Sequence, residues 1–220
     1  YCDAITRGVA PGGAPIIERL LLSPFNSAVL RAQGLDFEVG YQMPLDSLVN
    51  SWTGDLAFRF LATHYIKDYE DDGVSTPTDS AGQNTGDGPP SWLYRASLTY
   101  SNDPVTLTLT GRGVSSGTYD NSNIECVTSC PTSNSTNRTV NSNHIAGALY
   151  LDANVSYKVM EEAEDGVGVE AYLNVKNLMN KDPALVAQGP GGSAYGNIPT
   201  NPSFYDQLGR MFRAGIRFKM

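Results

Sequence analysis

Two polar segments bring together residue types that can bind metal ions. Cys126 and Cys130 lie close together in the polar segment IECVTSCP. A C-x3-C pair can ligate a metal, but neither His144 nor a second cysteine pair completes a convincing ligand set. We favour a small disulfide within a loop, which would place the chain in an oxidising compartment. We expect the partner of Cys2 to lie in a missing N-terminal portion.

The second segment is the acidic tract DYEDDG, which includes Asp68 and Asp72. Several carboxylate oxygens together can bind Ca²⁺. The tract lacks the positional pattern of a calcium loop, however, so we interpret it as the solvated base of a loop. We therefore expect no metal site and no cofactor.

No arrangement of side chains in the sequence indicates catalysis. His64 and His144 are far apart and have no serine or carboxylate partner at an informative position. A nucleophile without its base carries no enzymatic prediction, so we expect a protein that is not an enzyme. Aromatic side chains could instead stack on a ligand or pack against neighbouring loops. The candidates for ligand contact are Tyr69, Tyr119 and Tyr195.

Strands must position these residues, because alternation of apolar and polar residues recurs along the chain. In VTLTLTGRGV, Val105, Leu107 and Leu109 alternate with threonines. Successive side chains of a strand point to opposite faces, so this segment has one apolar and one polar face. No segment has sustained helical periodicity. The pattern predicts an all-β fold with eight strands, at about 15–22, 27–43, 51–69, 91–101, 105–120, 144–160, 166–178 and 204–220.

The apolar faces could contact either lipid or a soluble core. Tyr41, Trp92, Tyr100 and Tyr157 lie near strand ends on the apolar faces, where a membrane barrel has its interfacial aromatic residues. The opposite faces carry charges in mid-strand, which a watery lumen tolerates. The strands are also longer than a β-sandwich needs. We therefore favour a membrane barrel over a soluble sandwich, with these lumen-facing charges: Asp36, Glu38, Arg95, Arg112, Asp152 and Glu170.

The connections between the strands alternate in length. PLDS, SNDP and EEAEDG are short and rich in turn residues, and long polar segments separate them. Short periplasmic turns and long extracellular loops are typical of an outer-membrane barrel. The apolar residues form no run long enough for a transmembrane helix. The net charge of −8 argues against a nucleic-acid partner.

Three stretches of the chain resemble TonB-dependent outer-membrane receptors. The turn Asn177-Leu178-Met179-Asn180 after VEAYLNVK is similar to the family's Asn-Leu-Phe-Asp-like turn. The segment Phe204–Met220 contains Tyr-Asp and Gly-Arg pairs and resembles the last strand of the family. Met220 replaces the terminal aromatic residue of the family, and Phe218 keeps an outward aromatic side chain. NSAVLRAQGLDFEVGYQMPL resembles an upstream strand.

This resemblance implies a transmembrane barrel of about 22 strands, plugged by an N-terminal domain. Residues 1–220 would be its C-terminal part, without the plug. The implied function is TonB-energised uptake of a siderophore, cobalamin, haem or oligosaccharide through the outer membrane of a Gram-negative bacterium. The implied partners are the lipid bilayer, the plug and the rest of the barrel, TonB through the plug, and the barrel assembly machinery, which would read Phe218 and Met220. The alternatives are a passive porin, a self-contained eight-stranded barrel and a soluble carbohydrate-binding domain.

Overall fold

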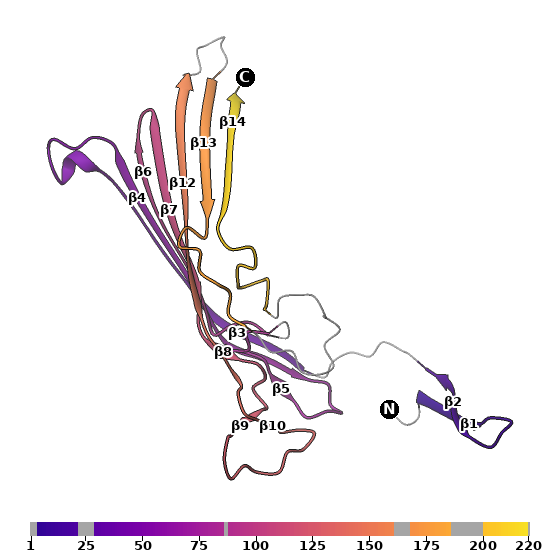
Figure 1. Ribbon diagram of the computed structural model, residues 1–220. Coiled ribbons are helices and arrows are strands. Elements are labelled where there is room, and N and C mark those ends of the chain that lie inside the picture. The colour runs from indigo at the N-terminus through magenta and orange to yellow at the C-terminus, as the bar shows by residue number, and fades with distance from the viewer. Residues whose placement is uncertain (1–3, 22–28, 86–87, 161–167, 186–199, 220) are drawn as a thin grey trace.

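Long β-strands dominate the computed structural model (Figure 1), which describes residues 4–21, 29–85, 88–160, 168–185 and 200–219. Seven of these strands form one antiparallel sheet, in the order β14-β13-β12-β7-β6-β4-β3. No helix within the described ranges is long and apolar enough to cross a membrane. The seven strands are β3 (Val29–Pro44), β4 (Asp55–Asp71), β6 (Trp92–Asn102), β7 (Val105–Val114), β12 (Ala148–Met160), β13 (Gly168–Lys176) and β14 (Met211–Lys219).

Shorter elements lie in the connections. A 3₁₀ helix (Leu45–Ser47) follows β3, and β5 (Thr78–Asp79) pairs with the end of β4. The short connections β3–β4 and β6–β7 lie at one end of the sheet, and β5 and β8 lie at the other end (Figure 1). The alternation of short and long connections predicted from the sequence is therefore confirmed from β3 to β12, and the predicted short turn EEAEDG lies outside the described residues. The long β7–β12 connection contains four short strands: β8 (Gly117–Thr118), β9 (Ile124–Glu125), β10 (Thr139–Val140) and β11 (His144–Ile145).

The register of the sheet gives it two chemically different faces. We call one the apolar face and the other the polar face. One row of side chains crosses all seven strands on the apolar face: Tyr41, Phe58, Leu98, Leu109, Ala153, Val175 and Phe212. The next row lies on the polar face: Gln42, Ala57, Thr99, Thr108, Asn154, Asn174 and Arg213. The alternation in the sequence therefore extends across the whole sheet.

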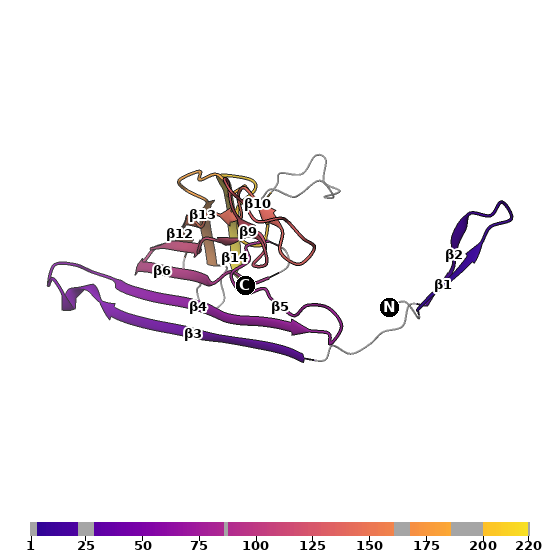
Figure 2. The same cartoon turned by 90° about the horizontal axis from the view of Figure 1, so that it is seen from below.

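The apolar face has no protein layer packed over it in the described part of the chain. Tyr41 is 64% exposed, Phe212 67% and Ile216 62%. Large contiguous apolar surfaces of this kind mark contact with a membrane or with another protein. Figure 2 shows the sheet as a single curved layer, and its edge strands β3 and β14 do not pair with each other. A two-layer sandwich and a closed eight-stranded barrel therefore do not describe these residues.

Several predicted strands differ from those of the structure. Strand β4 begins at Asp55 instead of residue 51, and β12 begins at Ala148 instead of residue 144. The segment 15–22 does not join the large sheet, because β2 (Pro15–Leu20) pairs with β1 (Ile5–Val9) in a separate hairpin. Strand β7 ends at Val114 instead of residue 120, where the chain turns into the loop that contains β8. The last strand begins at Met211 instead of residue 204, because residues 204–210 pack against the polar face through buried Tyr205.

Candidate functional site

All six predicted lumen charges lie on the polar face. Three of the acids have partners on adjacent strands. The Oδ1 atom of Asp36 accepts a hydrogen bond of 2.7 Å from the Thr63 hydroxyl. Glu38 lies 2.7 Å from Arg59, and Glu170 lies 2.9 Å from Arg217. Cross-strand pairing of opposite charges stabilises a sheet. These pairs also keep charged side chains on a single face.

The other three charges gather where β6, β7 and β12 lie side by side. Arg112 Nε lies 2.7 Å from Asp152, and Arg112 Nη2 lies 3.0 Å from Asp206, which precedes β14. The Arg112 guanidinium also lies 4.9 Å from the centre of the Tyr150 ring. Arg95 lies directly opposite Arg112 in the register. Two carboxylates therefore neutralise Arg112, and Asp206 ties the segment before β14 to the sheet.

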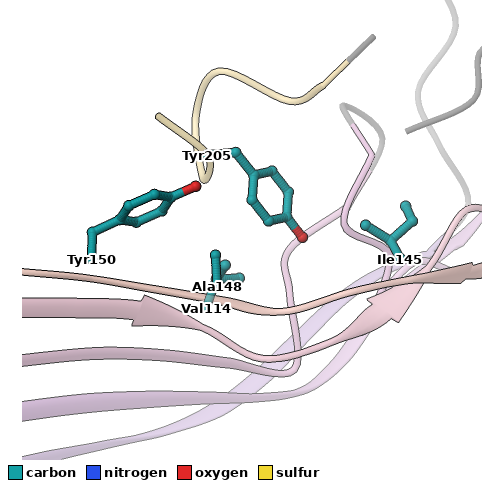
Figure 3. Close-up of a cluster of buried hydrophobic side chains, with 5 residues drawn as sticks. All are labelled: Val114, Ile145, Ala148, Tyr150 and Tyr205. Carbon is teal, nitrogen blue, oxygen red and sulfur yellow. The ribbon is translucent and has the colours of Figure 1, made fainter. Parts of the chain in front are cut away.

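We call residues 200–210 the covering segment, because they lie over the polar face at its long-connection end. Tyr205 is 2% exposed and packs in a small apolar cluster with Val114, Ile145, Ala148 and Tyr150 (Figure 3). Its hydroxyl donates a hydrogen bond of 2.8 Å to the Ala146 carbonyl. Burial raises the pKa of this hydroxyl. The buried cluster therefore lies between the covering segment and the sheet.

Hydrogen bonds join the covering segment to two other connections. Asn84 is fully buried, and its Nδ2 donates to the Ser115 carbonyl at 2.7 Å and to the Tyr205 hydroxyl at 2.9 Å. Asn201 Nδ2 donates to the Thr85 carbonyl at 2.9 Å. No pattern in the sequence points to Asn84, because its partners lie 31 and 121 residues away. Three long connections thus form one packed assembly at the long-connection end of the sheet.

The ion pair between Asp206 and Arg112 should measurably stabilise this assembly. The Asp206 side chain is only 9% exposed. We expect Asp206→Asn to lower the free energy of unfolding of the covering segment by about 1 to 3 kcal/mol, because a charge-assisted hydrogen bond is lost. The rate of protease cleavage in residues 200–210 measures this effect. Glu38→Gln is the control, since its pair with Arg59 is exposed and contributes at most about 1 kcal/mol. Equal cleavage of the two variants would contradict the assignment.

The candidate ligand-contact tyrosines lie in different places. Tyr119 is partly buried against the cluster of Val114 and Tyr205. Tyr69 is in β4, where Lys67 Nζ lies 5.4 Å from the centre of its ring. Tyr195 is outside the described residues. The contact of these three tyrosines with a ligand therefore stays a prediction.

The cysteine and C-terminal candidates are also partly described. Cys126 and Cys130 form a disulfide in the connection between β9 and β10. Cys2 lies outside the described residues. Phe218 is 63% exposed on the apolar face, opposite Val169. Met220 also lies outside the described residues.

Two carboxylates of the acidic tract hold the turn after β4. The Oδ1 atom of Asp71 accepts the backbone N–H of Gly73 at 2.8 Å. Asp72 Oδ1 accepts the N–H of Ser75 at 2.6 Å and that of Val74 at 2.8 Å. The hydrogen bonds to Asp72 lower the pKa of its carboxyl group, and the bond from the Ser75 N–H has the largest effect. Both acids therefore accept hydrogen bonds from the backbone of the turn.

The hydrogen bonds that stabilise this turn should be lost at low pH. Because the pKa of Asp72 is lowered in the folded chain, its support is complete above the ordinary value of 3.8 and is lost as the pH falls through the lowered value. We expect the NMR shifts of the Val74 and Ser75 amides to titrate below that ordinary value. An Asp72→Asn variant should abolish this titration. A transition at or above the ordinary pKa would contradict the assigned hydrogen bonds.

Aromatic side chains lie toward both ends of the apolar face. At the long-connection end, Trp92 stacks on His64 with 4.2 Å between ring centroids. At the short-turn end, Tyr100 lies next to Leu107. The stretch from Trp92 to Tyr100 is close to the 9 to 11 residues or so that a tilted strand needs to cross a bilayer. This arrangement matches the two aromatic girdles of a membrane barrel.

The sheet, its two faces and its alternating connections define a segment of a transmembrane β-barrel. A family model described as TonB dependent receptor-like, beta-barrel matches residues 3–178, and the chain belongs to this family. It is a family of outer-membrane receptors and transporters of Gram-negative bacteria. The match ends before β14, so the resemblance of Phe204–Met220 to the family's last strand stays a prediction. Comparisons with curated proteins and with solved structures find no match.

Proposed function

We propose that this chain forms the C-terminal part of the barrel wall of an outer-membrane receptor for TonB-energised uptake of a scarce nutrient. A siderophore, cobalamin, haem or an oligosaccharide is the proposed class of ligand. The observation that carries the proposal is the exposed apolar face of a single-layer sheet within a receptor-barrel family match. In this orientation the apolar face contacts lipid and the polar face lines the lumen.

The edges of the sheet support a place within a larger barrel. Strands β3 and β14 each pair on one side only among the described strands. Unpaired edges expose backbone hydrogen-bonding groups, which a bilayer does not tolerate. We propose that both edges pair with further strands, that a plug domain fills the lumen, and that the barrel assembly machinery reads the end of β14 through Phe218 and Met220.

The size of the native polypeptide tests the place of this chain in a larger receptor. An antibody against residues 211–219 should detect an outer-membrane protein several times heavier than the 23.7 kDa of this chain. A band at 23.7 kDa that resists SDS until boiled would instead indicate a self-contained barrel.

Uptake by cells tests the transport function. Cells that carry the receptor should accumulate one radiolabelled ligand of the four classes, and deletion of tonB should abolish this accumulation. The matched control is a strain without the receptor gene. Uptake that continues without TonB would contradict energised transport and would indicate a passive pore.

A further inference from the structure

Arginines on the polar face fall into two groups. Arg59, Arg112 and Arg217 each form an ion pair with an acid. Arg95 and Arg213, in contrast, form no ion pair with any residue that the structure describes. Both side chains are exposed. This second group leaves positive charge available on a chain whose net charge is −8.

The unpaired arginines line the same hollow of the polar face. The hollow has a volume of about 550 Å³, and its wall comes from β6, β7, β12, β13 and β14. Lys176 adds a third cation to the wall. This volume lies within the range of roughly 300 to 1,000 Å³ that is usual for small-molecule sites. Uncharged hydrogen-bonding side chains complete the lining: Thr108, Thr110, Asn154 and Asn174.

Among the residues that the structure describes, the only acid that lines this hollow already has partners. Asp152 lies 2.7 Å from Arg112, and it accepts the backbone N–H of Asn177 at 2.9 Å. It therefore offsets little of the charge that Arg95, Lys176 and Arg213 bring to the hollow. A second hollow of about 490 Å³ shares Arg95 and Lys176 with the first and is bordered by residues 202–208 of the covering segment.

Carboxylate and phosphate groups offer the hydrogen-bond acceptors and the negative charge that this set of side chains can bind. Guanidinium groups bind carboxylate and phosphate through paired hydrogen bonds, and amides and hydroxyls donate further ones. Arg95 lies directly opposite Arg112, whose charge Asp152 and Asp206 already neutralise. An anion in the hollow would therefore pair with Arg95 itself.

We propose that the hollow binds a small solute that carries carboxylate or phosphate groups. The inference rests on the proposed function, because the polar face is a lumen wall only within a barrel. It adds to that function a chemical class of solute and a site on the barrel wall. All residues that line the site lie on strands. Its cations would attract an anion without a cofactor.

Calorimetry on the purified whole receptor in detergent, at low ionic strength, tests this site. Citrate and inorganic phosphate are the anionic probes, and glycerol is the uncharged comparison. We expect saturable binding of at least one anion, which added salt weakens. The variant R95Q/R213Q should reduce this affinity about tenfold or more. The control R59Q/R217Q removes the same charge from the same face and should change it less than about twofold.

Each other outcome overturns the site. Absence of saturable anion binding overturns it, and so does an equal loss in both variants, which would indicate a general charge effect. Loss of thermal stability in R95Q/R213Q without anion binding would show that an acidic side chain of the receptor itself fills the hollow. Heat-modifiable migration on SDS gels shows that each variant is folded. The TonB requirement of uptake is measured separately, so energised transport can fail while citrate binding persists, and the reverse.

Discussion

A Leu98→Arg substitution is expected to destabilise the barrel by about 2 to 4 kcal/mol, since it places a charge on the lipid side of the membrane span. Leu98 is 41% exposed and lies between Phe58 and Leu109 in the row that crosses the apolar face. Its strand neighbours offer no acid on this face. We expect a strong loss of folded receptor in the outer membrane, measured as the fraction that migrates in the heat-modifiable form.

The adjacent residue provides a matched control. Thr99→Arg adds the same side chain to the same strand but on the polar face, where the cross-strand neighbours are Ala57 and Thr108. It removes one hydrogen bond of 3.0 Å between Thr99 and Thr108, which contributes about 1 kcal/mol. The folded fraction should stay near that of the wild type. Equal damage from both arginines, or greater damage from Thr99→Arg, would contradict the assignment of the two faces.

A Tyr205→Ala substitution should release the covering segment. Removal of a buried aromatic side chain costs about 3 to 5 kcal/mol, and here it also removes the hydrogen bonds to Asn84 and Ala146. We expect rapid cleavage of residues 200–210 by added protease on intact cells, while the barrel itself stays folded.

The variant Tyr205→Phe separates packing from hydrogen bonding. It keeps the ring among Val114, Ile145 and Ala148 and removes only the hydroxyl, at a cost of about 1 to 2 kcal/mol. Its cleavage rate should lie between those of the wild type and Tyr205→Ala. If Tyr205→Ala leaves the cleavage rate unchanged, the buried cluster does not hold this segment.

Periodicity in the sequence was sufficient to predict the large sheet. In β7, each of Val105, Leu107 and Leu109 lies on one face because strand geometry reverses the side-chain direction at every residue. The same rule placed Trp92 and Tyr100 on the apolar face. Short-range turn chemistry likewise identified the connection between β6 and β7.

Contacts between distant parts of the chain were not predictable in this way. Asn84 and Tyr205 are 121 residues apart, and neither has a neighbouring pattern that points to the other. Residues 204–210 lack the apolar–polar alternation of the strand that follows them, and Tyr205 packs in the buried cluster instead of extending β14. Similarly, residues 15–20 have strand character, but their pairing with β1 depends on contacts that a single segment does not specify.

The most direct test of the account asks which face of β7 contacts lipid. A fluorescent label on single cysteines at Leu107, Thr108, Leu109 and Thr110, with the native cysteines replaced by serine, is measured in the reconstituted whole receptor. The bilayer contains lipids with brominated acyl chains, which quench only nearby labels. We predict strong quenching at Leu107 and Leu109 and weak quenching at the two threonines. Equal quenching at all four positions, or stronger quenching at the threonines, would contradict a membrane barrel with this orientation.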